Sequence, residues 1–230
     1  MDARNSGEMG AYVNLGKFLH YRGFTLSEEP LRPSHVGPDA LKEGMTPSEV
    51  VKTMLTQLGE WEIIARRADG GRDMMVLILL SSDGKFAKAS QEFSRLLQSV
   101  AKKVRGGMDK DADLEIIVLA TEEVQEKKNL QAEIRTLNEQ QAGEKYFMYP
   151  YHIFSFVVPE VPIVPRHEIL SKKEAKQFMR LFQLEAKDIT RIPARDPAIV
   201  WIGARPGDYI SVWRLSESAH TRFPHLRIVA

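Results

Sequence analysis

Apolar residues recur at helical spacing in some parts of the chain and form short continuous runs in others. Over residues 93–104 and 124–141 they return every three or four positions, which predicts two helices, each with one buried face. The continuous runs Met74–Leu80 and Leu114–Leu119 predict strands of a sheet that is covered on both faces. This alternation of helices and strands predicts an α/β layer structure for residues 1–158.

Glycine, proline and capping residues mark the ends of the other elements in this part. We expect a frayed stretch at residues 1–10, followed by a helix that ends at Arg22-Gly23. Residues 24–45 are rich in proline and glycine, which predicts an irregular connection. The capping box Thr46-Pro47-Ser48-Glu49 predicts the start of a helix that ends at Gly59. Further strands are predicted at Trp61–Ala65, Tyr146–Tyr149 and His152–Val158.

A proline-rich segment divides the chain. Pro159, Pro162 and Pro165 make PEVPIVP stiff and extended, so we expect a linker at 159–165 between domains at 1–158 and 166–230. The second domain is predicted to be a small, mixed α+β unit. Its expected features are a helix capped by Ser171-x-x-Glu174 with Ala175, Phe178, Met179 and Phe182 inward, a helix start at Asp196-Pro197 before the apolar run Ala198–Ile202, a turn at Pro206-Gly207, and strands at Tyr209–Arg214 and Leu226–Val229.

Composition narrows the possible classes of protein. The 230-residue chain has a formal net charge of only +1 and contains no cysteine. Disulfide frameworks, thiolate zinc sites and cysteine nucleophiles are therefore excluded, and a reducing, intracellular location is expected. The longest apolar run, Met74–Leu80, is too short to span a bilayer, so we expect a soluble protein that does not bind membranes.

One pattern in the sequence suggests an enzyme. Asp73 followed by Asp83-Gly84-Lys85 matches the acid, spacer and D-x-K order of metal-dependent nucleases, in which two carboxylates hold Mg²⁺. Asp-Gly is also a favoured hairpin dipeptide, and here it directly follows an apolar run, so a turn is the preferred interpretation. The chain has no phosphate-binding glycine loop, no G-x-S-x-G and no H-E-x-x-H. We therefore expect no catalytic residues, no metal and no cofactor.

Two short basic clusters are candidates for contact with nucleic acid. Lys102, Lys103 and Arg105 end one predicted helix, and Lys127 and Lys128 lie at the start of the next charged helix. Such residues could contact a phosphate backbone. They could equally be the solvated end of a helix, where cations suit the helix dipole.

Four sequence blocks in the second domain resemble a known family. They are V-P-R-H-E-I-L-S-K-K-E, R-I-P-A-R-D-P-A, G-A-R-P-G-D and R-L-S-E-S, which begin at Val164, Arg191, Gly203 and Arg214. In this order and spacing they are similar to the assembly domain of the fifth subunit of eukaryotic and archaeal RNA polymerases. Two further blocks, Tyr149–Phe154 and Glu126–Leu130, look most like the versions encoded by large nucleocytoplasmic DNA viruses.

The resemblance implies a non-catalytic subunit of a multisubunit DNA-directed RNA polymerase. In that family a nuclease-like α/β jaw faces downstream duplex DNA, and the assembly domain docks on the largest subunit beside the other subunits. The family's DNA-contacting Thr-Pro-Ser loop is replaced here by Ala120–Val124, which lacks the proline and carries two acids. The expected location is the polymerase complex, in a virus factory or virion if the chain is viral and in the nucleus otherwise.

Large aromatic and arginine side chains are the candidates for partner binding in the second domain, because such residues often dominate protein interfaces. They are Arg191, Arg195, Trp201, Arg205 and Trp213, together with Glu217 of the last block. For both tryptophans a core position is the alternative. A metal-dependent nuclease and a free-standing DNA-binding adaptor are the alternative functions.

Overall fold

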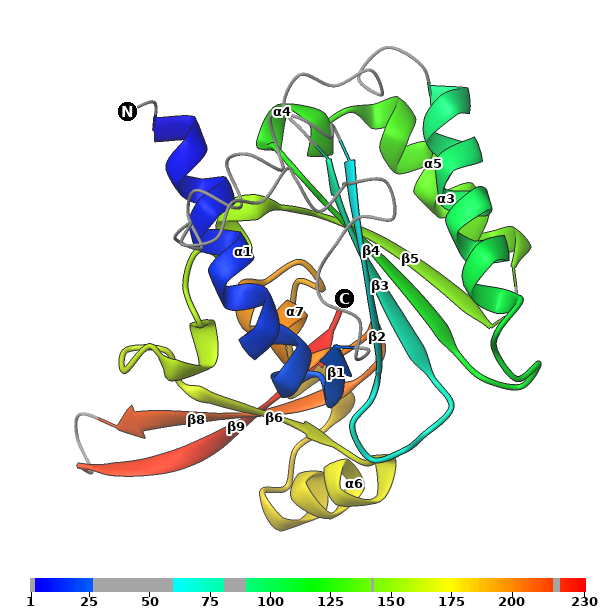
Figure 1. Ribbon diagram of the computed structural model, residues 1–230. Helices are drawn as coiled ribbons and strands as arrows, with labels where there is room; N and C mark the ends of the chain where they lie inside the picture. Colours follow the sequence, from blue (N-terminus) through cyan, green and yellow to red (C-terminus); the bar gives the residue numbers. More distant parts are fainter. Residues whose placement is uncertain (1–2, 27–59, 81–89, 142, 217–219) are drawn as a thin grey trace. The chain divides into compact units, whose positions relative to one another are not determined.

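The computed structural model describes residues 3–26, 60–80, 90–141, 143–216 and 220–230. These residues form two compact units, Met1–Ser155 and Phe156–Ala230, each with its own sheet (Figure 1). The helix expected at 46–59 and the Asp83-Gly84-Lys85 turn lie outside the described residues. The described residues are thus a mixed α/β structure with two sheets.

The first unit is built on a five-stranded sheet in sequence order. Its first three strands are antiparallel to their neighbours, whereas the last three run parallel to one another. The strands are β1 (Phe24–Leu26), β2 (Glu60–Arg67), β3 (Met74–Leu80), β4 (Leu114–Ala120) and β5 (Glu144–Pro150). Every residue of β3 and β4 is buried, as their continuous apolar runs predict.

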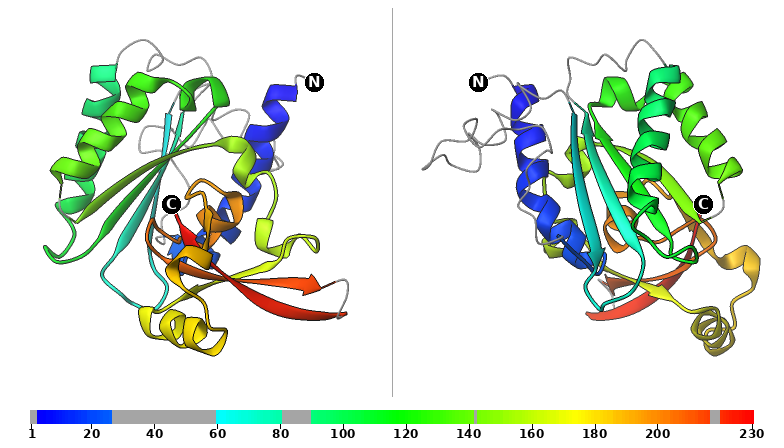
Figure 2. Two further views of the ribbon diagram at one scale, coloured as in Figure 1. Left: turned by 180° about the vertical axis from the view of Figure 1, so that it is seen from behind. Right: turned by 45° about the vertical axis from the view of Figure 1, so that its right-hand side comes forward.

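Helices cover both faces of this sheet (Figure 2). On one face, helices α3 (Ser90–Arg105) and α5 (Lys128–Gln140) pack on alternate residues of β3 and β4, such as Ile78 and Ile116. On the other face lies α1 (Ala3–Tyr21). The predicted α/β layers are confirmed, and the inward positions expected for α5, Leu130, Ile134 and Leu137, are buried.

Helix α1 begins earlier than the sequence indicated. Residues 3–10 are helical, so the expectation of a frayed stretch over residues 1–10 is wrong for them. The predicted end of the helix is confirmed. Gly23 adopts a left-handed backbone conformation, with φ of +75°, and its N–H donates to the His20 carbonyl at 2.9 Å.

The charged helix expected at about 124–141 is two helices. A short helix, α4 (Glu122–Gln125), precedes α5, and the chain between them leaves the helical conformation at Lys127, where ψ is 113°. Propensity alone does not mark this break, because the intervening residues are ordinary helix formers.

The strand predicted at His152–Val158 is wrong. Strand β5 ends at Pro150, and Tyr151–Phe154 form a 3₁₀-helix, η3, that packs against α1. The Tyr151 hydroxyl donates to the Leu80 carbonyl at 2.7 Å, and the Phe18 and Phe154 rings meet edge to face at 4.9 Å. These contacts stabilise a 3₁₀-helix in a sequence with high β propensity, because tertiary packing outweighs local propensity here.

The second unit has a four-stranded sheet in the order β6-β8-β9-β7. The outer pair β7 and β9 is parallel and the other neighbours are antiparallel. The elements are η4 (Val158–Glu160), β6 (Arg166–Leu170), α6 (Lys172–Leu181), η5 (Ala186–Asp188), β7 (Thr190–Ile192), α7 (Pro197–Ile202), β8 (Tyr209–Ser216) and β9 (Thr221–Val229). Ile199 of α7 packs on Ile210 and Val212 of β8 in a small core.

The capping box of α6 is confirmed, but its predicted inner face is not. The Glu174 N–H donates to the Ser171 hydroxyl at 3.2 Å, and the Ser171 N–H donates to the Glu174 carboxylate at 2.8 Å. Of the four residues expected to face inward, only Ala175 is buried, and Phe182 is exposed. The apolar stripe of α6 therefore lies largely at the surface.

Strand β9 is held by backbone hydrogen bonds on both sides. The Val229 N–H donates to Asp208 and its carbonyl accepts from Gly207, both at 2.9 Å. The Ala230 N–H donates to Ile192 at 2.9 Å, and its carbonyl accepts from the Ala194 N–H at 2.9 Å. Val229 and Ala230 thus link the end of the chain to β7, to the turn that follows β7 and to the turn before β8.

Candidate functional site

The arginines predicted to bind a partner occupy three segments of the second unit. Arg191 is on strand β7, and Arg195 lies in the turn before α7. Both side chains are exposed. Arg205 begins the turn before β8, and its N–H donates to the Asp208 carboxylate at 2.7 Å. Glu217 lies outside the described residues. Arg191 and Arg195 are the two that are open to a partner.

The two tryptophans differ in exposure. Trp201 is completely buried, with 0% of its surface exposed, so it presents no surface to a partner and its assignment as a binding residue is corrected to a core position. Trp213 is 37% exposed, and its indole N–H donates to the Glu168 carboxylate at 3.0 Å. Trp213 thus keeps both an accessible ring and a fixed orientation, as an interface residue requires.

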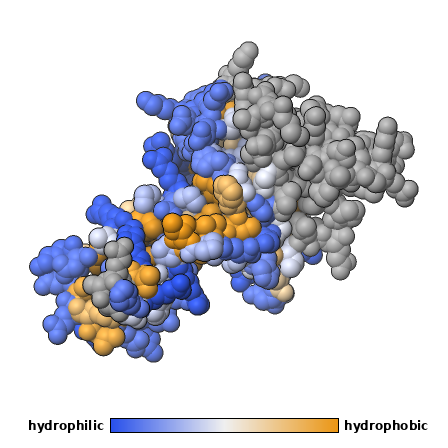
Figure 3. Space-filling model, turned by 90° about the vertical axis from the view of Figure 1, so that its left-hand side faces the viewer, coloured by the Kyte–Doolittle hydropathy of each residue, from blue (hydrophilic) through white to orange (hydrophobic). Residues whose placement is uncertain are grey.

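Several other large apolar side chains of the second unit are also exposed. Leu181 at the end of α6 is 77% exposed, and the ring of the adjacent Phe182 lies 4.6 Å from that of Phe178. On the β8–β9 hairpin, Leu215 and Phe223 are exposed as well. Figure 3 shows a face of the molecule on which hydrophobic side chains reach the surface among hydrophilic ones. Apolar exposure on this scale in a small unit is typical of a surface that contacts another protein.

In the first unit, Arg105 is not available to nucleic acid. Its guanidinium donates to the carbonyls of Ala112 and Gly143 and to the carboxylate of Glu144, at 3.2 Å for the last. Glu144 also accepts from the Tyr146 hydroxyl, and burial followed by this hydrogen bond raises the pKa of Tyr146. The assignment of Arg105 to a phosphate contact is therefore corrected, because its guanidinium holds the end of α3 to two loop carbonyls and to the first residue of β5.

The four lysines of the basic clusters have different surroundings. Lys103 forms an ion pair with Glu62 of β2 at 3.1 Å. Lys102 and Lys128 are exposed, and neither forms an ion pair within the residues that the structure describes. Lys127 is half-buried at the N-cap of α5. Lys102, Lys103 and Lys128 are thus all exposed, and Lys103 is the one of the three with an ion pair among the described residues.

The sheet topology keeps the two basic clusters apart. Helix α3 returns the chain from the end of β3 to the start of β4, and α5 returns it from the end of β4 to the start of β5. The last turn of α3 therefore lies at the edge where the parallel strands begin, and the first turn of α5 lies at the edge where they end. The length of α3 separates them, roughly 24 Å at 1.5 Å per residue. The five residues do not form one patch.

The nuclease pattern gains no support from the structure. Asp83 and Lys85 lie outside the described residues, and the Asp73 carboxylate accepts from the Asp113 N–H at 3.0 Å, which fixes a loop. Among the described residues, no group of three histidine, aspartate or glutamate side chains could hold a metal ion. The segment that replaces the DNA-contacting loop of the polymerase subunits contains the short helix α4.

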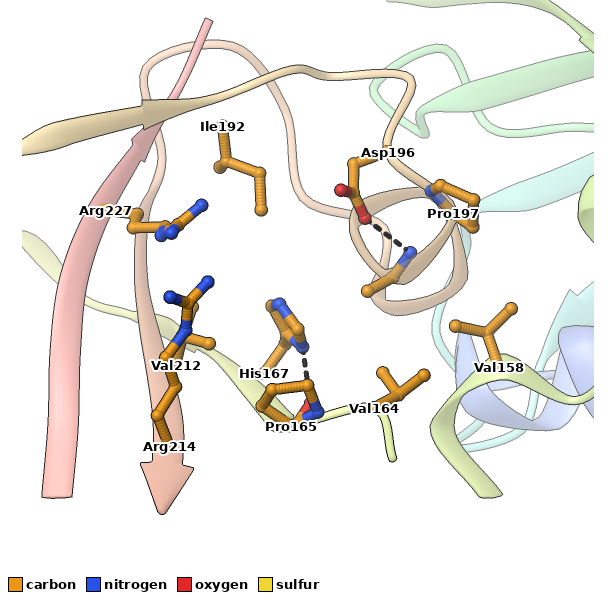
Figure 4. A pocket seen from close by; sticks show the side chains of 11 residues that line it. Val158, Val164, Pro165, His167, Ile192, Asp196, Pro197, Val212, Arg214 and Arg227 are labelled. Carbon is orange, nitrogen blue, oxygen red and sulfur yellow. Dashed lines mark hydrogen bonds between the residues drawn. The ribbon is translucent and has the colours of Figure 1, made fainter. Parts of the chain in front are cut away.

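A pocket of about 300 Å³ in the second unit was not predicted (Figure 4). Its walls are mostly aliphatic and come from η4, the segment before β6, the start of α7 and the strands. Its polar side chains are His167 of β6, Arg214 of β8, Arg227 of β9 and Asp196 before α7. Figure 4 shows the two guanidinium groups on one side of the pocket, turned toward each other, with Asp196 across from them.

Strand register explains how these residues meet. Val212 lies opposite His167 on β6 and opposite His225 on β9, and Arg227 lies opposite Ile210. Cross-strand partners share one face of a sheet, and so do alternate residues of a strand. The pocket residues are thus in phase with the buried Ile210 and Val212. Arg214 continues the alternation of Ile210 and Val212, so it lies on the face of the sheet that carries the core. This alternation is the sequence signal that was overlooked.

The charges of the pocket are not balanced. Burial lowers the pKa of Arg227, and the neighbouring Arg214 lowers it further, whereas Asp196 opposes both effects. Burial also lowers the pKa of His167, whose Nδ1–H donates to the Pro165 carbonyl at 2.6 Å, so this imidazole is neutral at neutral pH. The Asp196 carboxylate accepts from the Ala198 N–H at 2.9 Å and caps α7. The pocket therefore holds two cations and one anion.

Comparisons with known proteins agree on one family. Residues 156–229 match the sequence model of the RNA polymerase Rpb5 C-terminal domain. A "DNA-directed RNA polymerase RPB5 homolog" of African swine fever virus (isolate Tick/South Africa/Pretoriuskop Pr4/1996) is 27% identical over 211 residues, which cover 90% of each chain. The "DNA-directed RNA polymerase subunit Rpo5" of Thermococcus celer is 40% identical over 57 residues, 25% of this chain and 70% of that subunit. The same subunit of Thermococcus kodakarensis is 36% identical over 69 residues, 30% of this chain and 78% of its own length.

None of the helices in the described ranges could cross a membrane. Each lacks the combination of length and apolar character that a bilayer span requires.

Proposed function

The chain belongs to the Rpb5 family of DNA-directed RNA polymerase subunits, and from this membership we propose how its two units serve the polymerase. It is a non-catalytic subunit, and its relatives include those of a large DNA virus. Other polymerase subunits are therefore its partners. We propose that residues 156–230 dock on the largest of them, and that residues 1–155 form a jaw directed toward downstream duplex DNA.

One observation supports docking through the second unit. The family match spans residues 156–229, and the second compact unit spans Phe156–Ala230, so the two ranges nearly coincide. The archaeal subunits match this chain over only 57 to 69 residues, yet those residues are most of their own length. A segment of this size is thus enough for a polymerase subunit. The exposed arginines and apolar side chains of the second unit fit a docking surface.

The jaw proposal has less support from the described residues. Duplex DNA attracts proteins through exposed lysines and arginines that replace its counterions. Lys102 and Lys128 are suitable, but they lie at opposite edges of the sheet, so they do not form one cluster. If the jaw meets DNA in this way, the contact is small. As a viral polymerase subunit, the chain would work in the polymerase complex of the virus factory or virion.

The experiment is co-purification of the tagged full chain with its polymerase. In one variant Arg191 and Arg195 are replaced by alanine, and in the matched control Lys102 and Lys128 are replaced, which removes the same charge from the first unit. Loss of a cation from a paired interface costs about 2–5 kcal/mol, roughly thirty-fold or more in affinity. We expect the arginine variant to recover far less of the largest subunit and the lysine variant to recover as much as the wild type. Loss in the lysine variant alone would assign docking to the first unit instead.

A further inference from the structure

The pocket between α7 and the second sheet contains a hydrogen-bond donor that is not satisfied by the described residues. The Nε–H of Arg227 is buried, and it has no hydrogen-bond partner among the described residues. A buried donor of a charged group that lacks an acceptor destabilises the folded protein. Such a group in a native structure calls for an explanation, and an acceptor supplied from outside the chain is one.

Charge points to the nature of that acceptor. Arg214 and Arg227 enter the pocket from adjacent strands, and neither forms an ion pair within the part of the chain that the structure describes. The carboxylate in the pocket wall, Asp196, is already used to cap α7. Two guanidinium groups that converge can donate several hydrogen bonds to one small anion. The paired N–H groups of a guanidinium match the two oxygens of a carboxylate.

The shape and walls of the pocket decide between a carboxylate and a nucleic-acid backbone. Most of the lining is aliphatic or proline, as in Val158, Val164, Pro165 and Pro197, and the volume of about 300 Å³ accommodates one side chain. A phosphate backbone repeats its charge along its length and is bound by a row of exposed cations. A single concave site with apolar walls fits the methylene groups and the carboxylate of one acidic side chain.

We propose that this pocket binds one aspartate or glutamate side chain of another polymerase subunit, with its carboxylate held by Arg214 and Arg227. The proposal rests on the proposed function, because it takes the acidic residue from a neighbouring subunit. The carboxylate accepts the Nε–H of Arg227 and neutralises the surplus positive charge. The aliphatic walls contact the methylene groups of the same side chain.

The test uses the tagged full chain assembled with its polymerase. Arg214→Gln and Arg227→Gln each remove one guanidinium and keep a polar side chain of moderate size. Arg222→Gln is the matched control, since it makes the same change on β9 at an exposed residue whose register places it on the other face of the sheet. The measurement is the amount of polymerase recovered with the tag over a series of salt concentrations, with and without nuclease treatment of the lysate.

We expect both pocket variants to recover at least about tenfold less polymerase than the wild type at a fixed salt concentration, because each loses a charge-assisted hydrogen bond. The Arg222→Gln chain should match the wild type. The thermal unfolding temperature of the free Arg227→Gln protein should be equal to or above that of the wild type, since a desolvated and unpaired cation has been removed.

Three results would overturn the inference while the proposed function stands. They are full recovery by both pocket variants, an equal loss in the Arg222→Gln control, and a loss that accompanies a lower unfolding temperature, which would make the arginines structural. If nuclease treatment abolishes the difference between wild type and variants, the pocket binds a phosphate instead. If even the wild type recovers no polymerase, the proposed function fails and this inference falls with it.

Discussion

The two units of this chain use their charged residues in opposite ways. In the first unit, Arg22 binds Glu115 and Arg105 binds Glu144, so these cations hold the unit's own elements together. In the second unit, Arg191 and Arg195 are exposed and the Nε–H of Arg227 is unsatisfied within the described residues. These two buried pairs thus stabilise the first unit, whereas the second leaves the Nε–H of Arg227 as a donor for another molecule.

The apolar residues show the same contrast. Strands β3 and β4 of the first unit are buried along their whole length between two layers of helix. The core cluster of the second unit contains five buried residues, while Leu181 and Phe182 of α6 remain exposed. A unit of this size buries a smaller share of its surface than a larger domain does. The comparison shows that the first unit has the larger core and that the second leaves more apolar side chains exposed.

The largest expected effect tests the internal ion pair of the first unit. Nη2 of Arg22 lies 2.7 Å from both carboxylate oxygens of Glu115, and both side chains are 8% exposed. Arg22→Met leaves a buried carboxylate without its partner, so we expect a loss of about 3–5 kcal/mol in the free energy of unfolding. Urea denaturation measures it. The control is Lys103→Met, whose exposed pair with Glu62 is worth about 1 kcal/mol or less. Equal losses in the two variants would contradict the conclusion that the buried pair contributes more to the first unit than an exposed pair does.

A smaller effect is expected where η3 meets the sheet. Tyr151→Phe removes the hydroxyl that donates to the Leu80 carbonyl at 2.7 Å and leaves the ring in place. A lost buried hydrogen bond of this kind costs about 1–2 kcal/mol. Urea denaturation, compared with Tyr21→Phe on the exposed side of α1, should show this loss in the buried variant alone. An unchanged midpoint would mean that η3 does not contribute to the stability of the first unit.

Helix α6 allows the second unit to be tested in the same way. Ser171→Ala removes the hydroxyl that accepts from the Glu174 N–H and should cost about 1 kcal/mol, because N-cap hydroxyls contribute about that much. Faster amide hydrogen exchange in α6 would report the loss, and Thr221→Ala on β9 serves as a control with no cap. Unchanged exchange would mean that α6 is held by packing rather than by its cap.

The same capping box predicts a dependence on pH. The hydrogen bonds of Ser171 lower the pKa of Glu174. A carboxyl whose pKa is lowered on folding stabilises the protein above its ordinary pKa, and this contribution disappears as the pH falls through the lowered value. In acid, α6 of the wild type and of Glu174→Gln should therefore exchange at converging rates. A constant difference down to the lowest pH would exclude Glu174 from the cap.

The smallest effect concerns DNA. Each lysine that meets a phosphate adds about 0.9 to the slope of log affinity against log salt. Lys102 and Lys128 lie at opposite edges of the sheet, so we expect only one of the single variants Lys102→Ala and Lys128→Ala to lower the slope for downstream duplex bound to the assembled polymerase. Fluorescence anisotropy over a salt series measures it. Equal reductions in both variants would contradict the separation of the two clusters.

The first unit could be predicted largely from its sequence, because its signals are local. The apolar runs of β3 and β4, the stripe of α5 and Gly23 at the end of α1 all specify structure within a few residues. The predictions failed where distant contacts decide. Tyr151 joins a turn because its hydroxyl reaches Leu80, which is 71 positions away. Arg105 is held by a loop 38 positions further along the chain, and no helical pattern reports such a contact.

The binding residues were harder to predict than the fold. A buried Trp201 and an exposed Trp213 occur in similar apolar segments, and only packing distinguishes them. The pocket draws Arg214 and Arg227 from two strands, so the register of β8 and β9 is needed before they can be seen as a pair. The exposed stripe of α6 has the spacing of a buried face, because a surface that binds another protein follows the same pattern as one that meets the chain's own core.

The strand order of the second sheet has a consequence for the order in which the unit folds. Strand β7 is made before β8 and β9, yet within the described residues its hydrogen-bonded neighbour is β9, which follows it far along the chain. Pairing between distant segments is slow, because a long loop must close before any contact forms. A ribosome therefore releases β7 with no strand to pair with until β9 has emerged. Pulse-labelling hydrogen exchange during refolding should show the amides of β7 gaining protection together with those of β9, and later than those of α6.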